Sequence, residues 1–258
     1  MVDGGYGARD ERPDWFLLGE ELMWPLVGMG CAIARTNGLP VELRAIPELA
    51  LCHHASCLKT SIFANGEGCH SAAICLVRQS IEALTVFEVG LQPPDFAAPL
   101  LGAWNEGKMK QGELRRALER DVWSAYGEGL WDESWAEFYA NLTRGVQPYA
   151  HYTTELQGWQ FVTVANDDTG HALISFGLET QDPLKMTRVA LLHMLLSWML
   201  GRILLAHGES GDVLERRATI ALLGRALGQS KLLWDRGEWW AQLSPHMFFK
   251  PGHDWRDS

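Results

Sequence analysis

The sequence predicts an all-α fold: a multi-helix bundle with one inserted β-hairpin at about residues 159–177. Three observations carry this prediction. Most of the chain places apolar residues at helical spacing between proline and glycine breaks, and one central segment is apolar on nearly every side. Only one segment alternates with the two-residue period of a strand. A helix that is apolar on most sides is expected in the middle of its bundle.

The helices follow one another in a regular order. The first covers Asp14–Arg35, with Pro25 as a kink and TNGLP as its end. A pair follows, Pro47–Phe63 and Cys69–Leu91, separated by a sharp turn at NGEG and ended by QPPD, since proline does not continue a helix. The remaining expected helices cover about Phe96–Trp104, Gly112–Tyr126, Asp132–Arg144, Pro183–His207 and Asp212–Trp234.

The expected hairpin is formed by WQFVTVA and HALISFG, which flank the loop NDDTG. Pairing about the centre of this loop places four apolar residues on one face: Val162, Val164, Ile174 and Phe176. Two strands alone are marginally stable in water. We therefore expect the hairpin to dock on the helices or on the hairpin of a second copy of the chain.

Composition indicates one folded domain over residues 1–258, with an aromatic-rich tail from about residue 235. The chain is 47% hydrophobic and contains 12 tryptophans, which is typical of a protein with a large core. Its formal net charge of −10 disfavours binding to nucleic acid or to an anionic membrane surface. The best candidate for a domain boundary lies between Gly145 and Gly158. Helices of the same kind occur on both sides of it, so we predict a single domain.

Several features predict a cytoplasmic location. The N-terminus lacks the order of basic, apolar and small residues found in a secretory signal. Five cysteines, an odd number at irregular spacing, do not indicate a secreted disulfide framework. The apolar run Val189–Leu200 is short for a membrane span, contains His193 and is bracketed by Arg188 and Arg202, so we interpret it as a buried helix.

The segment Leu51–Cys75 contains four of the five cysteines. Zinc sites pair close ligands at a spacing that this segment does not have. A site formed by His53, Cys57 and Cys75 across the helical hairpin is an alternative, but small thiols also suit close packing of helices, and we predict that role. No metal and no cofactor are expected.

The central helix carries the clearest candidate for a binding site. Arg78 and Glu82 stand one turn apart on a narrow polar stripe of an otherwise apolar helix, and Cys75 lies on the same stripe. Burial of two charges costs several kcal/mol per ion before pairing offsets it. The pair therefore has one of two roles. It fixes the register in which the helices pack, or it forms a ligand site in which Arg78 binds an anionic group and Glu82 orients it.

Two segments carry a resemblance to a group of proteins. LVRQSIEAL contains Arg78-x3-Glu82, and FYANLTRGVQPYAHY follows about 60 residues later. Together they resemble a broad group of largely uncharacterised bacterial helical proteins with an Arg-x3-Glu motif in a central helix. The likeness covers about residues 50–210, and the matched positions are Arg78, Glu82 and Leu142–His151. The chain has Gln147 before Pro148, where the group has histidine.

The same group resembles, more distantly, the HEPN superfamily of small helical bundles. Many of its members are metal-independent ribonucleases with an Arg-x4–6-His motif. In that chemistry arginine stabilises a pentavalent phosphate and histidine transfers a proton. Arg144 and His151 match with six intervening residues at a helix end, so the resemblance implies that they are the catalytic pair.

Two further matches to this motif fall in the apolar helix near residue 200. Arg188 precedes His193 and Arg202 precedes His207, each with four intervening residues. We expect these histidines to be hydrogen-bonded core residues because their neighbours are apolar. The motif is short enough to arise by chance, and the acidic charge balance weakens an RNA-binding interpretation.

The leading interpretation is a bacterial cytoplasmic protein that binds a small anionic ligand or a partner without catalysis. It is expected to form a homodimer whose interface is supplied by the aromatic tail and the exposed hairpin. Arg78, Glu82 and Cys75 are the predicted ligand-binding residues. One alternative is a HEPN-like ribonuclease using Arg144 and His151, with Arg78 and Glu82 nearby, and another is a metal-binding helical sensor. Walker loops, nucleophile elbows and zincin motifs are absent from the sequence.

Overall fold

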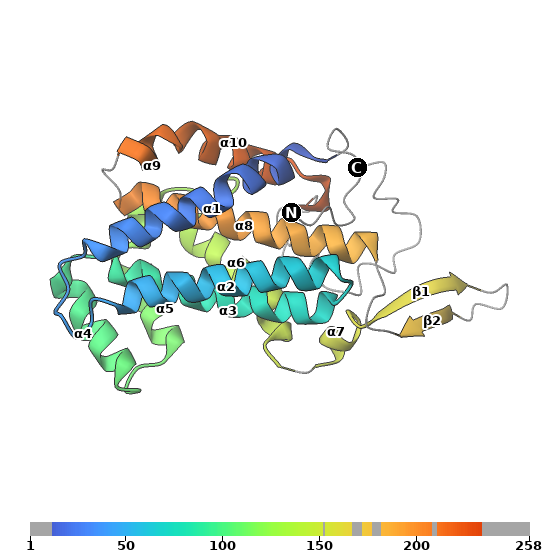
Figure 1. Cartoon of the computed structure of the whole chain (residues 1–258), viewed down its shortest axis with the longest axis horizontal. Coiled ribbons are helices and arrows are strands. Elements are labelled where there is room, and N and C mark those ends of the chain that lie inside the picture. The colour runs from blue at the N-terminus through green and yellow to red at the C-terminus, as the bar shows by residue number, and fades with distance from the viewer. Residues whose placement is uncertain (1–11, 152, 167–171, 177–181, 208–210, 234–258) are drawn as a thin grey trace.

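Two antiparallel helices, α2 (Ile46–Gly66) and α3 (His70–Gly90), run side by side through the middle of the molecule (Figure 1). The computed structural model describes residues 12–151, 153–166, 172–176, 182–207 and 211–233. The turn between the two helices uses Gly68 at φ 77°, a backbone conformation that glycine adopts without strain. At the far end of the pair, a Cβ added at Gly90 would lie 2.1 Å from Cγ of Pro47, so the helices approach too closely there for any side chain at this position.

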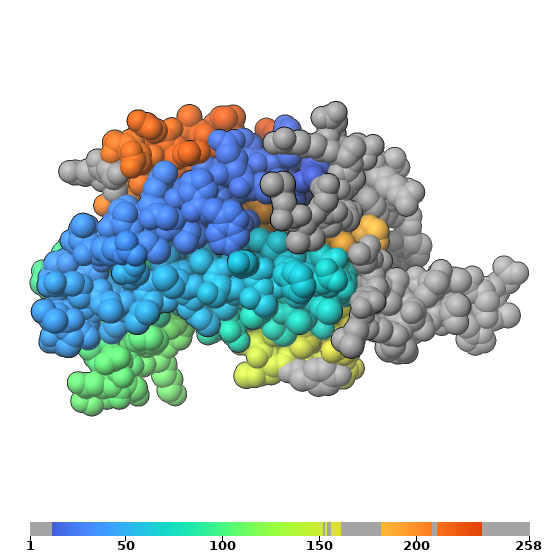
Figure 2. All heavy atoms as spheres, in the orientation of Figure 1, coloured from blue at the N-terminus to red at the C-terminus, as the bar shows by residue number. Residues whose placement is uncertain are grey.

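The most buried helix is α8 (Pro183–His207), which packs against α2, α3 and two outer helices, α1 (Asp14–Arg35) and α10 (Arg217–Gly228). Its sequence is apolar around the whole circumference for most of its length, which explains its central place. On the face shown in Figure 2, α1, α2 and α10 leave little of α8 visible. The expected buried helix is therefore confirmed.

Two described helices, α1 and α8, are long and apolar enough to cross a membrane by length and composition alone. Within the most apolar window of each helix, 83% of the residues of α8 are buried inside the protein, compared with 33% for α1. The core helix of a soluble protein passes the same test, so neither helix assigns a location to the chain.

Shorter helices cover the other side of the α2–α3 pair (Figure 1). The first residues of α6 are capped on both sides, because Ser134 Oγ accepts a hydrogen bond from the Glu137 backbone N–H at 3.3 Å and the Glu137 carboxylate accepts one from the Ser134 N–H at 3.1 Å. The remaining helices with their bounds are α4 (Pro94–Asn105), α5 (Gln111–Asp121), η2 (Trp123–Tyr126), α6 (Trp135–Val146), η3 (Gln147–Tyr149), α7 (Thr154–Gln157), α9 (Gly211–Glu215) and η4 (Lys231–Leu233).

Two strands, β1 (Phe161–Asn166) and β2 (Ala172–Phe176), lie beyond one end of the helices (Figure 1). They pair antiparallel, with Ile174 opposite Thr163 and Phe176 opposite Phe161. This register differs from the one expected from the loop, which would place Ile174 opposite Val162. An irregularity between Thr163 and Ala165 moves the pairing by a further residue, a feature that alternation alone does not reveal.

The all-helical bundle is confirmed, and the bounds of α1 and α8 agree with those predicted. Two of the expected helices are divided. The Gly112–Tyr126 helix ends as α5 at Asp121 and continues as the 3₁₀ helix η2, and the Asp212–Trp234 helix is broken near Arg216 into α9 and α10.

Buried apolar residues from α1 to η4 form one continuous core. The aromatic tail lies outside the described residues.

Candidate anion-binding site

A small cavity of about 60 Å³ lies where α3, α5 and α6 meet. Polar side chains from all three helices line it, and they include both members of the predicted pair on α3. The lining residues are Arg78, Glu82, Thr85, Gln111, Gly112, Arg115, Tyr139 and Thr143. A cavity beside the Arg78–Glu82 pair is what a ligand site on this helix requires.

The predicted ion pair forms, since Nη2 of Arg78 lies 2.8 Å from Oε1 of Glu82. The side chain of Arg78 is 18% exposed, but that of Glu82 is 41% exposed. Both residues are therefore partly buried, and the more exposed Glu82 stands at the rim of the cavity. Cys75, the third predicted residue on this stripe, is not among the residues that line the cavity. Burial raises the pKa of its thiol.

A second guanidinium faces the same cavity from α5. Arg115 is half-buried, and its Nε atom is buried without a hydrogen-bond partner. Nε of Arg78 is likewise buried without a hydrogen-bond partner. Across the described residues no carboxylate pairs with Arg115, whereas Arg78 shares its charge with Glu82. The cavity thus holds two positive charges and one negative charge.

Uncharged groups complete the wall. The hydroxyls of Tyr139 and Thr85 lie 2.5 Å apart, and both side chains are buried. Burial raises the pKa of the Tyr139 hydroxyl, outweighing the opposite effect of the nearby Arg115 and Arg78, so Tyr139 stays neutral. Gln111 Nε2 donates to the Glu82 carbonyl oxygen at 2.6 Å, which attaches the start of α5 to α3 beside the cavity.

This arrangement can recognise a small oxyanion. Guanidinium groups present planar sets of N–H donors that match carboxylate and phosphate oxygens. Buried donors without a partner, such as the Nε–H groups of Arg78 and Arg115, cost free energy that an acceptor in the cavity would recover. Sequence reasoning found Arg78 and Glu82 but missed Arg115 and Tyr139, because they come from other helices and no local pattern marks them.

The pair implied by the HEPN resemblance lies elsewhere. Arg144 is exposed near the end of α6, where its Nη1 donates to Oδ1 of Asn141 at 3.4 Å. His151 is exposed beyond η3. Neither residue lines the cavity on α3. The expectation that Arg78 and Glu82 act beside this pair in a ribonuclease site has no support from the cavity.

The histidine of the Arg188 match on α8 is a core residue, as expected. His193 is 2% exposed, and its Nε2 donates to Oγ of Ser61 at 2.7 Å, while Ser61 itself donates to the Ala73 carbonyl oxygen. Burial lowers the pKa of His193 to about 3. A neutral histidine held between two helices in this way ties α8 to α2.

The cysteines of the α2–α3 hairpin are all free thiols. Cys57 is buried, with its Sγ 3.5 Å from Nε2 of His53 and 3.9 Å from Oε1 of Gln79. Within the part of the chain that the structure describes, no group of three or more histidine, cysteine, aspartate or glutamate side chains is arranged to hold a metal ion. The hairpin therefore brings His53 and Cys57 together without the further ligands of a zinc site.

A second polar group, which the sequence analysis missed, occupies the other end of α3. The Glu88 side chain is 1% exposed, and its Oε1 accepts a hydrogen bond from Nε1 of Trp123 at 2.8 Å. Burial raises the pKa of Glu88 to about 7, although Tyr126 and Trp123 act in the opposite direction. The sequence does contain a sign of this buried carboxylate, because Glu88 is the single charged residue in the apolar run TVFEVG. It was missed because it lies next to, and not on, the polar stripe of Arg78 and Glu82.

Comparison of the chain with protein-family models, with curated proteins and with solved structures found no match. The resemblance to bacterial Arg-x3-Glu proteins and to the HEPN superfamily stays a prediction. Function has to be argued from the two polar sites themselves.

Proposed function

We propose that this protein binds a small oxyanion in the cavity between α3, α5 and α6, with Arg78 and Arg115 as the groups that hold it. The observation that carries the proposal is the guanidinium of Arg115, which lines a cavity and has no carboxylate partner among the described residues. Among the described residues, no ion pair explains why a cation lies at this position. The role is recognition, as the leading interpretation of the sequence had it.

The size of the cavity limits the ligand to a compact group. About 60 Å³ suits a phosphate, a sulfate or the carboxylate group of a larger molecule, the rest of which would lie outside the cavity. It is too small to enclose an extended ligand. Glu82 at the rim both holds Arg78 in place and repels an incoming anion, because its carboxylate lies 2.8 Å from Nη2 of Arg78. Binding is therefore expected to be modest and to weaken with added salt.

The test measures binding of inorganic phosphate by isothermal titration calorimetry at low ionic strength. Arg115→Gln removes one charged donor from the cavity, and a hydrogen bond to a charged group contributes about 1.5–3 kcal/mol, so affinity should fall by about tenfold or more. Arg116→Gln is the matched control: it removes the same charge from the next residue of α5, which is exposed and does not line the cavity. Equal effects of the two variants, or no phosphate binding by the wild-type chain, would refute the proposal.

The homodimer also remains a proposal. It was expected from the β-hairpin and the aromatic tail, and two strands without further partners are marginally stable. We propose that β1 and β2 persist as a hairpin through contact with a second copy. Equilibrium sedimentation should then give about twice the mass of the 28.9 kDa chain, and a monomer at every concentration would exclude this arrangement.

A further inference from the structure

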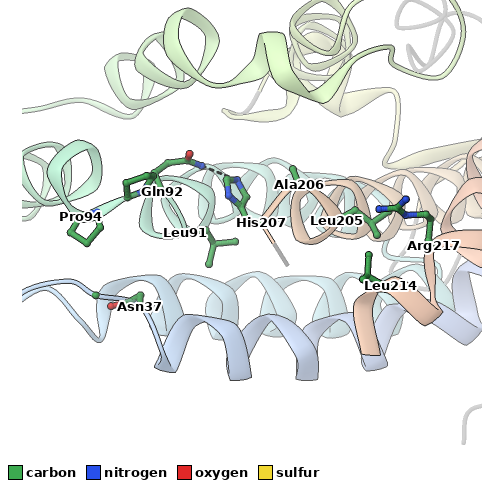
Figure 3. Close-up of a pocket in the computed structure, with 11 residues that line it drawn as sticks. Asn37, Leu91, Gln92, Pro94, Leu205, Ala206, His207, Leu214 and Arg217 are labelled. Atoms are coloured by element: carbon green, nitrogen blue, oxygen red, sulfur yellow. Dashed lines mark hydrogen bonds between the residues drawn. The ribbon is translucent and has the colours of Figure 1, made fainter. Parts of the chain in front are cut away.

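A much larger pocket, of about 680 Å³, opens at the end of the bundle where α1, α3 and α8 finish (Figure 3). It is separate from the Arg78–Arg115 cavity and shares no lining residue with it. Six of its eleven described lining residues are leucine, proline or alanine, and four have polar side chains. The lining residues are Asn37, Gly38, Leu91, Gln92, Pro93, Pro94, Leu205, Ala206, His207, Leu214 and Arg217.

The hydrogen bonds behind this wall determine which nitrogen of His207 carries a proton. Nε2 of Gln92 donates to the Glu88 carbonyl oxygen at 3.0 Å, and this contact fixes the amide with its N–H₂ group toward His207. The same amide nitrogen lies 2.8 Å from Nε2 of His207, shown by the dashed line in Figure 3. Nε2 must therefore act as an acceptor, and in a neutral imidazole the proton is then on Nδ1.

The Tyr126 hydroxyl also lies 2.7 Å from this Nε2 atom. Tyr126 lowers the pKa of the buried Glu88 carboxyl, which an O–H group does by donating toward the carboxylate, so Gln92 remains the donor to Nε2. Burial lowers the pKa of His207 to about 4, so the ring is neutral near pH 7. Nδ1–H of His207 has no hydrogen-bond partner among the described residues and remains available to a ligand.

The charge of the pocket favours an anion. Arg217 is exposed and has no ion-pair partner in the described part of the chain, and none of the described residues that line the pocket is acidic. Figure 3 shows Arg217 and Leu214 on one side of the pocket and His207, Gln92 and Leu91 on the other, with Ala206 and Leu205 between them.

We propose that this end pocket binds a small aliphatic carboxylic acid. The carboxylate is held by the guanidinium of Arg217, and the aliphatic part lies against the leucine and proline side chains of the wall and extends toward His207. A volume of about 680 Å³ accommodates a ligand of this size, and a pocket that combines apolar side chains with polar groups is typical of small-molecule sites. Leu214, which is 43% exposed, would be covered by the bound chain.

The test uses hexanoate as the probe, with binding to the full chain measured by calorimetry. Hexanoate should bind one per chain, and hexylamine, which has the same apolar chain but the opposite charge, should not. Arg217→Gln should weaken hexanoate binding by about tenfold or more. Arg225→Gln is the matched control, because it removes the same charge from an exposed position of α10 outside the pocket and should leave the affinity unchanged.

A second readout separates this site from the proposed oxyanion site. The ¹⁵N chemical shifts of the His207 imidazole should show the Nδ1–H tautomer in the free protein and should change when hexanoate binds, whereas Arg115→Gln should leave hexanoate binding intact. The inference is overturned by a hexanoate affinity that is absent, that falls equally in both arginine variants, or that is matched by hexylamine.

Discussion

Replacement of Glu88 by glutamine should stabilise the protein at neutral and alkaline pH. In the folded protein the pKa of this carboxyl is raised to about 7 by burial, compared with 4.5 for an exposed glutamate. Between these two values the folded state holds the proton and the unfolded chain has lost it. The free energy of unfolding therefore falls as pH rises from 4.5 to about 7, and it stays lowered above that range.

The magnitude follows from the two pKa values. One pKa unit corresponds to about 1.4 kcal/mol, so ionisation of Glu88 removes about 3 kcal/mol of stability between about pH 4 and about pH 8. Glu88→Gln is neutral throughout and keeps an oxygen acceptor for Nε1 of Trp123, so it should not suffer this loss. The unfolding free energy of the variant, minus that of the wild type, should rise by about 3 kcal/mol over the same pH interval.

The assay is urea unfolding followed by tryptophan fluorescence at a series of pH values. Burial lowers the pKa of His54, His193 and His207, so these groups add stability as pH rises through the acid range. They act equally in both proteins and cancel in the difference. Glu119→Gln, at an exposed position of α5, is the control. The prediction is refuted if the difference in unfolding free energy between variant and wild type does not depend on pH, or if Glu119→Gln gives the same difference. Either result would mean that burial does not raise the pKa of Glu88 in the folded protein.

Two further outcomes are expected. Glu82→Gln removes the one carboxylate that lines the oxyanion cavity and should raise phosphate affinity by about fivefold; weaker binding would mean that the pair with Arg78 is needed for the site. Gly224→Ala should lower stability by about 1–3 kcal/mol in thermal unfolding, since its Cβ would lie 2.5 Å from Nε1 of buried Trp198. Gly28→Ala, which meets no atom within 4 Å, should instead be neutral or slightly stabilising.

The helices were predictable because their signals are local. Residues Asp14–Arg35 and Pro183–His207 have apolar runs that begin near a proline and end near a glycine or an asparagine, and the structure has helices with these bounds. The break near Arg216 was not predictable in this way, since both sides of it are compatible with helix. The bend lets α9 and α10 follow the surface of α8, which is a tertiary requirement.

The candidate sites were predictable only in part. The spacing of Arg78 and Glu82 shows that they share one face of a helix and can pair, and they do. It does not show that Glu82 reaches the surface, because exposure depends on where α5 and α6 pack. Arg115 enters the same cavity from a helix more than 30 residues away, and no periodicity within either helix indicates that meeting.

By itself, the sequence determined an all-helical bundle, the place of its most apolar helix and the ion pair on its central polar stripe. Each of these depends on hydrophobic periodicity or on spacing within one helix, which are properties of a short stretch of chain. Only the tertiary structure decided that Glu88 is a buried carboxyl, that His207 lies beside Gln92 and Tyr126, and that Arg115 and Arg217 face cavities. The reason is physical: the protonation and solvent exposure of a polar group depend on partners supplied by distant segments, and those partners become neighbours only when the helices pack.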